Sequence, residues 1–283
     1  MPARSLALSI VLGLVALAPA CTQSRASTIP AEGLTLRHAW TPGARFEAEV
    51  LHREQGEGVE RRSSFHVTRV VTTIDESGKA LVDASVSRIR LDWTQPDRAS
   101  EAEAAARRLE GANIRFFVDA RGQALDVPTP PPELDESTAH ALEILIAGAT
   151  SGCQPLPDRP LRRHASWTTV EGEGLARHTF VGLVEAQPER RLARIDSAAA
   201  VTSQRARTSV AVIFDVDGGF VTEVWSTTSL GRLPSSQVDW KATWRVADDV
   251  AEVGSPTGSP LGARCPEAPR RRRCLRHLIE GRL

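Results

Sequence analysis

The chain has 283 residues, with 35 basic and 35 acidic side chains and therefore no formal net charge at neutral pH. Residues 21–263 hold 27 basic against 33 acidic residues, whereas the tail from Arg264 onward holds seven arginines against two glutamates. A mildly acidic body with a basic tail is not typical of nucleic-acid-binding proteins, so we expect no nucleic-acid partner. The length suffices for one large β domain or two smaller units.

Residues 1–20 have the layout of a secretory signal peptide. Arg4 supplies the basic start, an apolar run extends from Leu6 to Ala18, and small residues flank Pro19 directly before Cys21. The apolar run has 13 residues, fewer than the roughly 20 that a membrane-spanning helix needs. A cleaved segment is therefore favoured over a transmembrane anchor.

The small residues that end at Cys21 resemble the lipobox of bacterial lipoprotein precursors, in which this cysteine is acylated and becomes the mature N-terminus. Leu17 lies one position earlier than the leucine of that motif, and Ala18 and Ala20 also fit ordinary signal cleavage. The resemblance implies a lipid on Cys21 that anchors the protein to a membrane of the cell envelope; the alternative is a free secreted protein. Thr22, in place of aspartate, implies the outer membrane, with the protein facing the periplasm.

The polar residues 21–32 fit a lipidated tether, and residues 33–150 are predicted to form the first of two β-rich halves. Apolar and polar residues alternate with the period of a β-strand, between turn signals such as Ser77-Gly78. Phe65, Val67, Arg69 and Val71 fall on one face of such a strand. The predicted strands of this half are residues 46–50, 65–74, 80–91, 114–118 and 124–127.

Two segments of the first half favour helices. Residues 99–109 consist of strong helix formers, with Ser100 a suitable N-cap residue, and their charged faces predict a surface helix. Residues 137–147 place Ala141, Leu142, Leu145 and Ile146 on one stripe. We expect this second helix to cover an open face of a sheet.

Residues 151–247 repeat the order of strands and turns and are predicted to form the second β-rich half. Asp217-Gly218, between two apolar strands, is a strong signal for a tight hairpin. The pattern suggests a degenerate internal duplication, although any series of hairpins looks self-similar. The predicted strands of this half are residues 166–170, 178–184, 192–201, 210–214, 220–230 and 238–246.

Residues 248–283 are predicted to be a flexible linker and a basic tail that contains the arginine run 270–273. The run is either solvated or in contact with anionic lipids or polymers of the envelope.

If Cys21 is acylated, three cysteines remain. Cys265 and Cys274 are the nearest pair in the sequence, which favours a disulfide between them. The alternative pairs Cys153 with one of the two tail cysteines. No cysteine has a partner at zinc-site spacing, so we expect no metal.

No catalytic or phosphate-binding motif occurs in the sequence, so we expect no catalytic residues, no cofactor and no enzymatic activity. His66 and His178 occupy comparable positions in the two halves, either as a shared polar site or as two ordinary strand residues. Asp215 and Asp217 fit a hairpin turn better than a calcium loop.

Six tryptophans are predicted to fill the core or else to line an apolar ligand pocket: Trp40, Trp93, Trp167, Trp225, Trp240 and Trp244.

The predicted fold is mainly antiparallel β with one or two inserted helices. It is either a curved sheet or half-barrel covered by the helix 137–147, or two similar packed β units. The first arrangement resembles envelope lipoproteins and lipoprotein carriers that hold acyl chains in a half-barrel.

The function expected first is that of an envelope lipoprotein without enzymatic activity that contacts a protein or polymer. The alternative is a carrier of lipid or another apolar ligand, which requires a cavity between sheet and helix. Enzymatic activity is the third hypothesis, and a serine or aspartate beside a histidine in a pocket would favour it.

Overall fold

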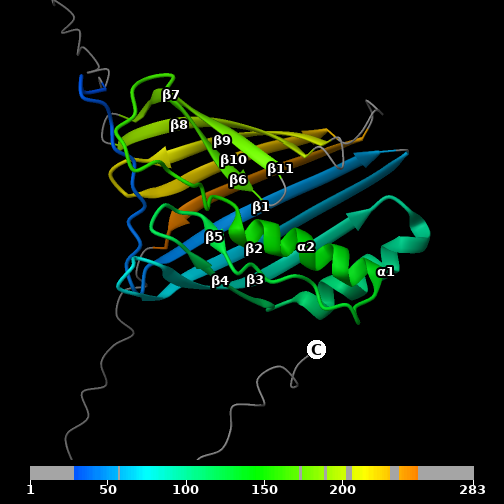
Figure 1. Ribbon diagram of the computed structural model, residues 1–283. Coiled ribbons are helices and arrows are strands. Elements are labelled where there is room, and N and C mark those ends of the chain that lie inside the picture. The colour runs from blue at the N-terminus through cyan, green and yellow to red at the C-terminus, as the bar shows by residue number, and fades with distance from the viewer. Residues whose placement is uncertain are drawn as a thin grey trace, which may run out of the picture.

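The computed structural model describes residues 29–56, 58–171, 174–187, 190–201, 206–229 and 236–247. Within them, eleven antiparallel strands form one continuous open sheet, and two helices lie on one of its faces (Figure 1). The fold is therefore mainly β, consistent with the predicted curved sheet or half-barrel, and its strands do not divide into two packed sheets. The predicted signal peptide, Cys21, and the tail with Cys265 and Cys274 lie outside the described residues.

Two meanders and one joining strand make up the sheet. The first meander comprises β1 (Arg45–Gly56), β2 (Val59–Ile74), β3 (Ala80–Trp93), β4 (Asn113–Val118) and β5 (Ala124–Leu125). The second comprises β6 (Ser166–Glu171), β7 (Gly174–Gln187), β8 (Arg190–Val201), β9 (Ala206–Asp215) and β10 (Phe220–Ser229), and the joining strand is β11 (Gln237–Val246). The first meander runs from the centre of the sheet to one edge. The second runs from the opposite edge to the centre, where β11 pairs with both β10 and β1.

Every predicted strand has a counterpart in the sheet, and the differences lie at the strand ends. The strand predicted over residues 46–50 continues to Gly56. Its polar end pairs with the start of β2 through charged side chains: Arg53 of β1 donates to Glu60 of β2 at 2.7 Å, and Arg61 of β2 donates to Glu54 of β1 at 3.4 Å. Cross-strand ion pairs thus extend the sheet beyond its apolar pattern.

The longer helix, α2 (Glu136–Thr150), covers the predicted face of the sheet. It begins at Asp135, whose side chain accepts a hydrogen bond from the Thr138 backbone N–H at 2.8 Å. Ala141 and Leu145, from the predicted stripe, are fully buried against the sheet. The helix therefore supplies the second layer that an amphipathic sheet needs to bury its apolar face.

The shorter helix, α1 (Pro96–Leu109), packs against β3 and α2. Ala105 is buried in this contact, while the charged outer side chains Glu103 and Arg107 are exposed and bonded at 2.6 Å. The helix begins earlier than the sequence predicted, so Ser100 lies inside it and is not the N-cap residue. Proline suits the first helical turn because its φ is preset and its missing N–H would have no partner there.

A buried arginine joins the sheet to the end of α2. Arg69 of β2 lies on the apolar face that the alternation predicted, and only 4% of its surface is exposed. Its Nε donates to the Ala149 carbonyl oxygen at 2.6 Å, and its Nη2 donates to that of Ser151. The guanidinium also stacks 3.6 Å from the centre of the Trp244 ring. Burial lowers the pKa of Arg69 to about 10, so the group stays charged at neutral pH and complements the negative end of the helix dipole.

We expect Arg69→Met to lower the free energy of unfolding by about 2–4 kcal/mol. Two helix-terminal carbonyls lose charge-assisted donors worth about 1.5–3 kcal/mol each, and the removed desolvation cost of the guanidinium offsets part of that loss. Urea unfolding followed by tryptophan fluorescence measures the change. Arg45→Met, at a half-exposed position of β1, is the control and should change stability by less than about 0.5 kcal/mol. An Arg69→Met protein as stable as the parent would contradict this role.

Candidate functional site

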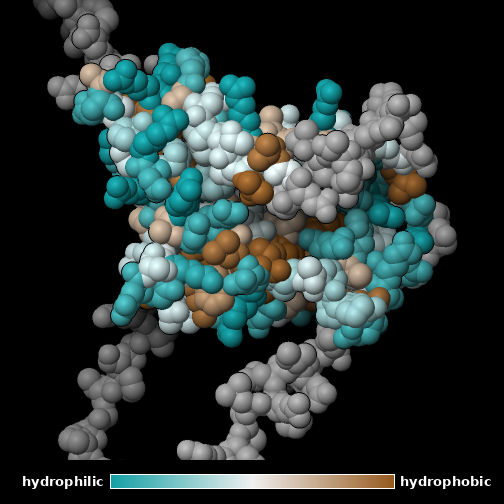
Figure 2. Space-filling model, viewed as in Figure 1, coloured by the Kyte–Doolittle hydropathy of each residue, from teal (hydrophilic) through white to brown (hydrophobic). Residues whose placement is uncertain are grey.

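A cavity of about 510 Å³ lies between α2 and the central and second-meander strands. Ile144 and Ala147 form its helix side, and Val212, Val224 and Trp240 belong to its sheet side. Figure 2 shows hydrophobic side chains exposed in the hollow between the helix layer and the upper strands. The sheet and the helix therefore enclose the kind of apolar space that a carrier requires.

Cys153 also lies on the cavity wall, in the loop that follows α2. Burial raises the pKa of its thiol, so the thiol is neutral at pH 7. It has no disulfide partner among the described residues. Both predicted pairings, Cys265 with Cys274 and Cys153 with a tail cysteine, remain predictions.

Four ionisable side chains gather beside α2, at the end of β1 and the start of β2, and we call them the polar cluster: His52, Glu54, Arg61 and His140. The carboxylate of Glu54 is at the centre. Its Oε2 lies 3.2 Å from Nε2 of His140 and 3.4 Å from Nη1 of Arg61. Its Oε1 lies 3.6 Å from Nε2 of His52. Because His52 also lines the cavity, the polar cluster adjoins the apolar space.

Several polar atoms in and beside the polar cluster are buried without a hydrogen-bond partner among the described residues. They are Nδ1 of His52, Nε of Arg61, Oγ of Ser63 and Nε1 of Trp93. Strand register explains their proximity, because His52 pairs with Ser63 across β1 and β2, and Arg61 pairs with Trp93 across β2 and β3. Most buried polar atoms in folded proteins have partners, so this group marks a place of functional interest.

Glu54 and Arg61 form an ion pair within the polar cluster. Burial lowers the pKa of His52 to about 4, so its imidazole is neutral. Burial opposes ionisation of Glu54, but its hydrogen bond with His140 and the nearby guanidinium of Arg61 hold the pKa of its carboxyl below the usual range. Glu54 is therefore ionised and neutralises Arg61, which is always protonated.

His52 and Ser63 are the serine–histidine neighbours that would favour an enzyme. Ser63 is 3% exposed, however, and its Oγ accepts or donates no hydrogen bond within the described residues. A serine nucleophile is activated by a base within hydrogen-bond reach. Ser63 Oγ and the His52 imidazole make no such hydrogen bond.

The structure does not bring His66 and His178 together. His66 projects from β2 on the face opposite Phe65, whereas His178 lies on the buried face of β7. His178 stacks on Trp167 with ring centres 5.2 Å apart, and its Nδ1 lies 2.8 Å from Oγ of Ser197. Its surroundings are those of a hydrogen-bonded core residue. The prediction of a polar site shared by the two histidines is therefore wrong, and the alternative of two separate strand residues holds.

Asp215 and Asp217 form the turn between β9 and β10, as predicted. Oδ1 of Asp215 accepts hydrogen bonds from the backbone N–H groups of Asp217 and Gly218 at 3.0 and 2.8 Å. Each carboxylate also pairs with an arginine of β8, Asp215 with Arg190 and Asp217 with Arg191. These contacts stabilise the hairpin, and they occupy both carboxylates with hydrogen bonds and ion pairs inside it.

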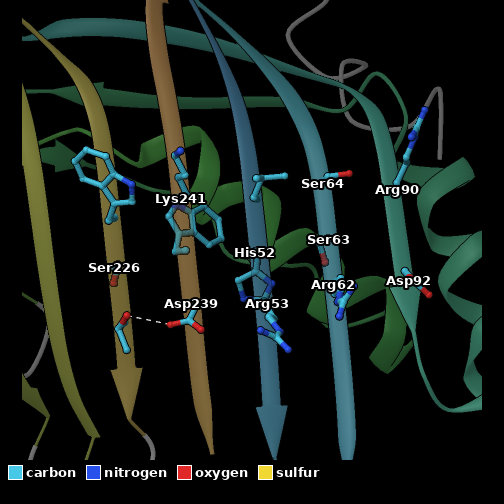
Figure 3. A pocket seen from close by; sticks show the side chains of 14 residues that line it. His52, Arg53, Arg62, Ser63, Ser64, Arg90, Asp92, Ser226, Asp239 and Lys241 are labelled. Carbon is cyan, nitrogen blue, oxygen red and sulfur yellow. Dashed lines mark hydrogen bonds between the residues drawn. The ribbon is translucent and has the colours of Figure 1, made fainter.

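A second hollow, of about 620 Å³, lies on the opposite face of the sheet, and we call it the outer groove. In Figure 3 the helices lie behind the strands, and side chains such as Arg53, Arg62 and Arg90 lie on the side away from them. Trp225 and Leu51 are 36% and 47% exposed on this face. Arg53, Arg90 and Lys241 line it together with aspartates.

Of the six tryptophans, Trp93, Trp167 and Trp244 are buried, Trp40 and Trp240 pack against the core, and Trp225 is exposed.

Comparison of the sequence with protein-family models and with curated proteins finds no match. Among solved structures, a chain from the structure described as "Lipid-protein interactions in lipovitellin" matches 78% of this chain, with a TM-score of 0.43 and 9% identity. This chain covers 27% of that chain. The likeness is too low to assign a function. Within the described residues, no helix is long and apolar enough to cross a membrane.

Acid is expected to destabilise the fold between about pH 6.5 and 4. Burial lowers the pKa of His52 and of His178 to about 4, so both stay neutral in the folded protein while the unfolded chain binds protons below about pH 6.5. The free energy of unfolding should fall by about 2 kcal/mol per histidine between pH 7.5 and 5. Urea unfolding at pH 7.5 and 5.0 measures this loss. The loss should shrink in His178→Gln and not in His66→Gln; an equal loss in both would contradict the assignment.

Proposed function

We propose that the protein binds an apolar ligand, such as an acyl chain, in the cavity between α2 and the sheet. The supporting observation is the cavity itself, because its volume of about 510 Å³ falls within the range of about 300–1,000 Å³ typical of small-molecule sites. Its walls are largely apolar, with Ile144, Val212 and Trp240 among them. Each methylene group moved from water into such a site contributes about 0.8 kcal/mol. An acyl chain therefore gains binding energy there without specific polar contacts.

Contact with an envelope protein or polymer is the second candidate function, and the outer groove is the observation that favours it. Trp225 and Leu51 expose apolar surface there beside Arg53, Arg62 and Lys241. Tryptophan and arginine are enriched among the residues that dominate protein interfaces. Because the outer groove and the cavity lie on opposite faces of the sheet, the two functions are compatible.

Filling the cavity from its rim tests the first function. Ala147 lies on the cavity wall and is exposed, so Ala147→Trp should block the space without disturbing the core. We expect it to weaken binding of a fluorescent fatty-acyl probe by about tenfold or more. Ala104→Trp, at an exposed position of α1, is the matched control and should bind like the parent.

Native mass spectrometry of protein purified from an oxidising periplasm is the companion measurement. A reproducible added mass that is lost in organic solvent is expected for the parent and for Ala104→Trp, and not for Ala147→Trp. Unchanged probe affinity in Ala147→Trp would exclude the cavity as the site. A parent protein that binds no probe and carries no added mass would contradict the function itself.

We further propose that a lipid on Cys21 holds the protein in the cell envelope, at the outer membrane facing the periplasm. The motif that ends at Cys21 supports this. Cys21→Ser should therefore move the protein from the membrane fraction to the soluble periplasmic or secreted fraction, as followed by fractionation and immunoblotting. Cys153→Ser is the control and should stay with the membrane. Membrane association that persists in Cys21→Ser would contradict the anchor.

A further inference from the structure

We propose that the ligand is an amphiphile whose head group is uncharged and carries a hydroxyl, and that this head group binds at the polar cluster. The inference rests on the proposed function and assigns the chemistry of the other end of the ligand. His52 connects the two regions, because it lines the apolar cavity and lies 3.6 Å from Glu54. His52 is the one member of the polar cluster that lines the cavity, so a head group that contacts it would lie next to Glu54.

The unpartnered atoms indicate what the head group must offer. The side chain of His52 is 4% exposed, and its Nδ1 has no partner among the described residues. A hydroxyl both donates and accepts, so it can pair with this nitrogen in either tautomer of the imidazole. It can equally accept from Arg61 Nε or exchange a hydrogen bond with Ser63 Oγ, which are also without partners in the described part of the chain.

The ion pair between Glu54 and Arg61 argues against a free carboxylate head. Arg61 already has a counterion in Glu54, at 3.4 Å, and Glu54 also accepts a hydrogen bond from His140 at 3.2 Å. Burial keeps His52 neutral at pH 7, so it supplies no further positive charge. A second carboxylate would therefore lie beside Glu54, where like charges repel in a partly desolvated site.

Two ligands with the same acyl chain test the head group: monopalmitoylglycerol, which is neutral and has two hydroxyls, and palmitate. Displacement of a fluorescent acyl probe at pH 7.5 gives both dissociation constants. We expect the parent protein to bind monopalmitoylglycerol about tenfold or more tightly than palmitate, the change that one well-made buried hydrogen bond produces. His52→Phe keeps the ring and its contact with Trp240 but removes both nitrogens, and should reduce the preference to about threefold or less.

The outcomes separate this inference from the proposed function. Equal affinity for the two ligands in the parent, or a preference that persists in His52→Phe, would overturn the head-group inference and leave the carrier function intact. Absence of binding by both ligands would overturn both. If His52→Phe does not fold, Ser63→Ala removes the neighbouring hydroxyl and should lower the preference in the same direction. His66→Phe, on the opposite face, is the control and should keep the parent's preference.

Discussion

The hydrogen bonds of Arg69 determine where α2 lies, and the cavity depends on that position. A guanidinium in an apolar core is costly to desolvate, and here its cost is offset by two helix-terminal carbonyls and the face of Trp244. These partners exist only when the end of α2 meets β2. The arrangement therefore favours one placement of the helix over others that would bury the same apolar stripe.

The inserted helices follow the first meander, and the second meander has no helix of its own among the described residues. The buried face of β9 and β10 instead meets α2 across the cavity, and the N-terminal segment covers another part of that face, where the Ala39 backbone N–H donates to the Gly219 carbonyl oxygen at 2.9 Å. Apolar side chains such as Val212 and Val224 remain on the cavity wall because one helix is too narrow to fill the space over a sheet of this width. The asymmetry between the two meanders thus produces the cavity.

Periodicity was sufficient to predict the strands, both helices and the buried face of β2, because each depends on neighbours in the sequence. The polar cluster could not be predicted in the same way, since Glu54 and His140 meet only through the sheet register and the placement of α2. One signal was present in the sequence: His52 and Glu54 continue the alternation of Phe46, Ala48 and Val50 onto the buried face. The predicted strand covered only the regular alternation from Phe46 to Val50, and the cross-strand charges that extend it become visible only with the partner strand.

The contacts of α2 also bear on how a ligand enters. At its N-terminal end, Asp135 caps the helix and accepts a hydrogen bond from Arg108 of α1 at 2.7 Å. At the C-terminal end, Arg69 holds the last carbonyls, and Gly148 lies so close to Phe65 that a side chain there would collide with its ring. A helix held at both ends and in close contact at one turn is a fixed wall. Ala147 is exposed on the cavity side of that wall, so the proposed ligand would have a route past it that leaves the helix in place. A preformed cavity costs little reorganisation on binding, so for the proposed ligand more of the energy of burying an acyl chain would contribute to affinity.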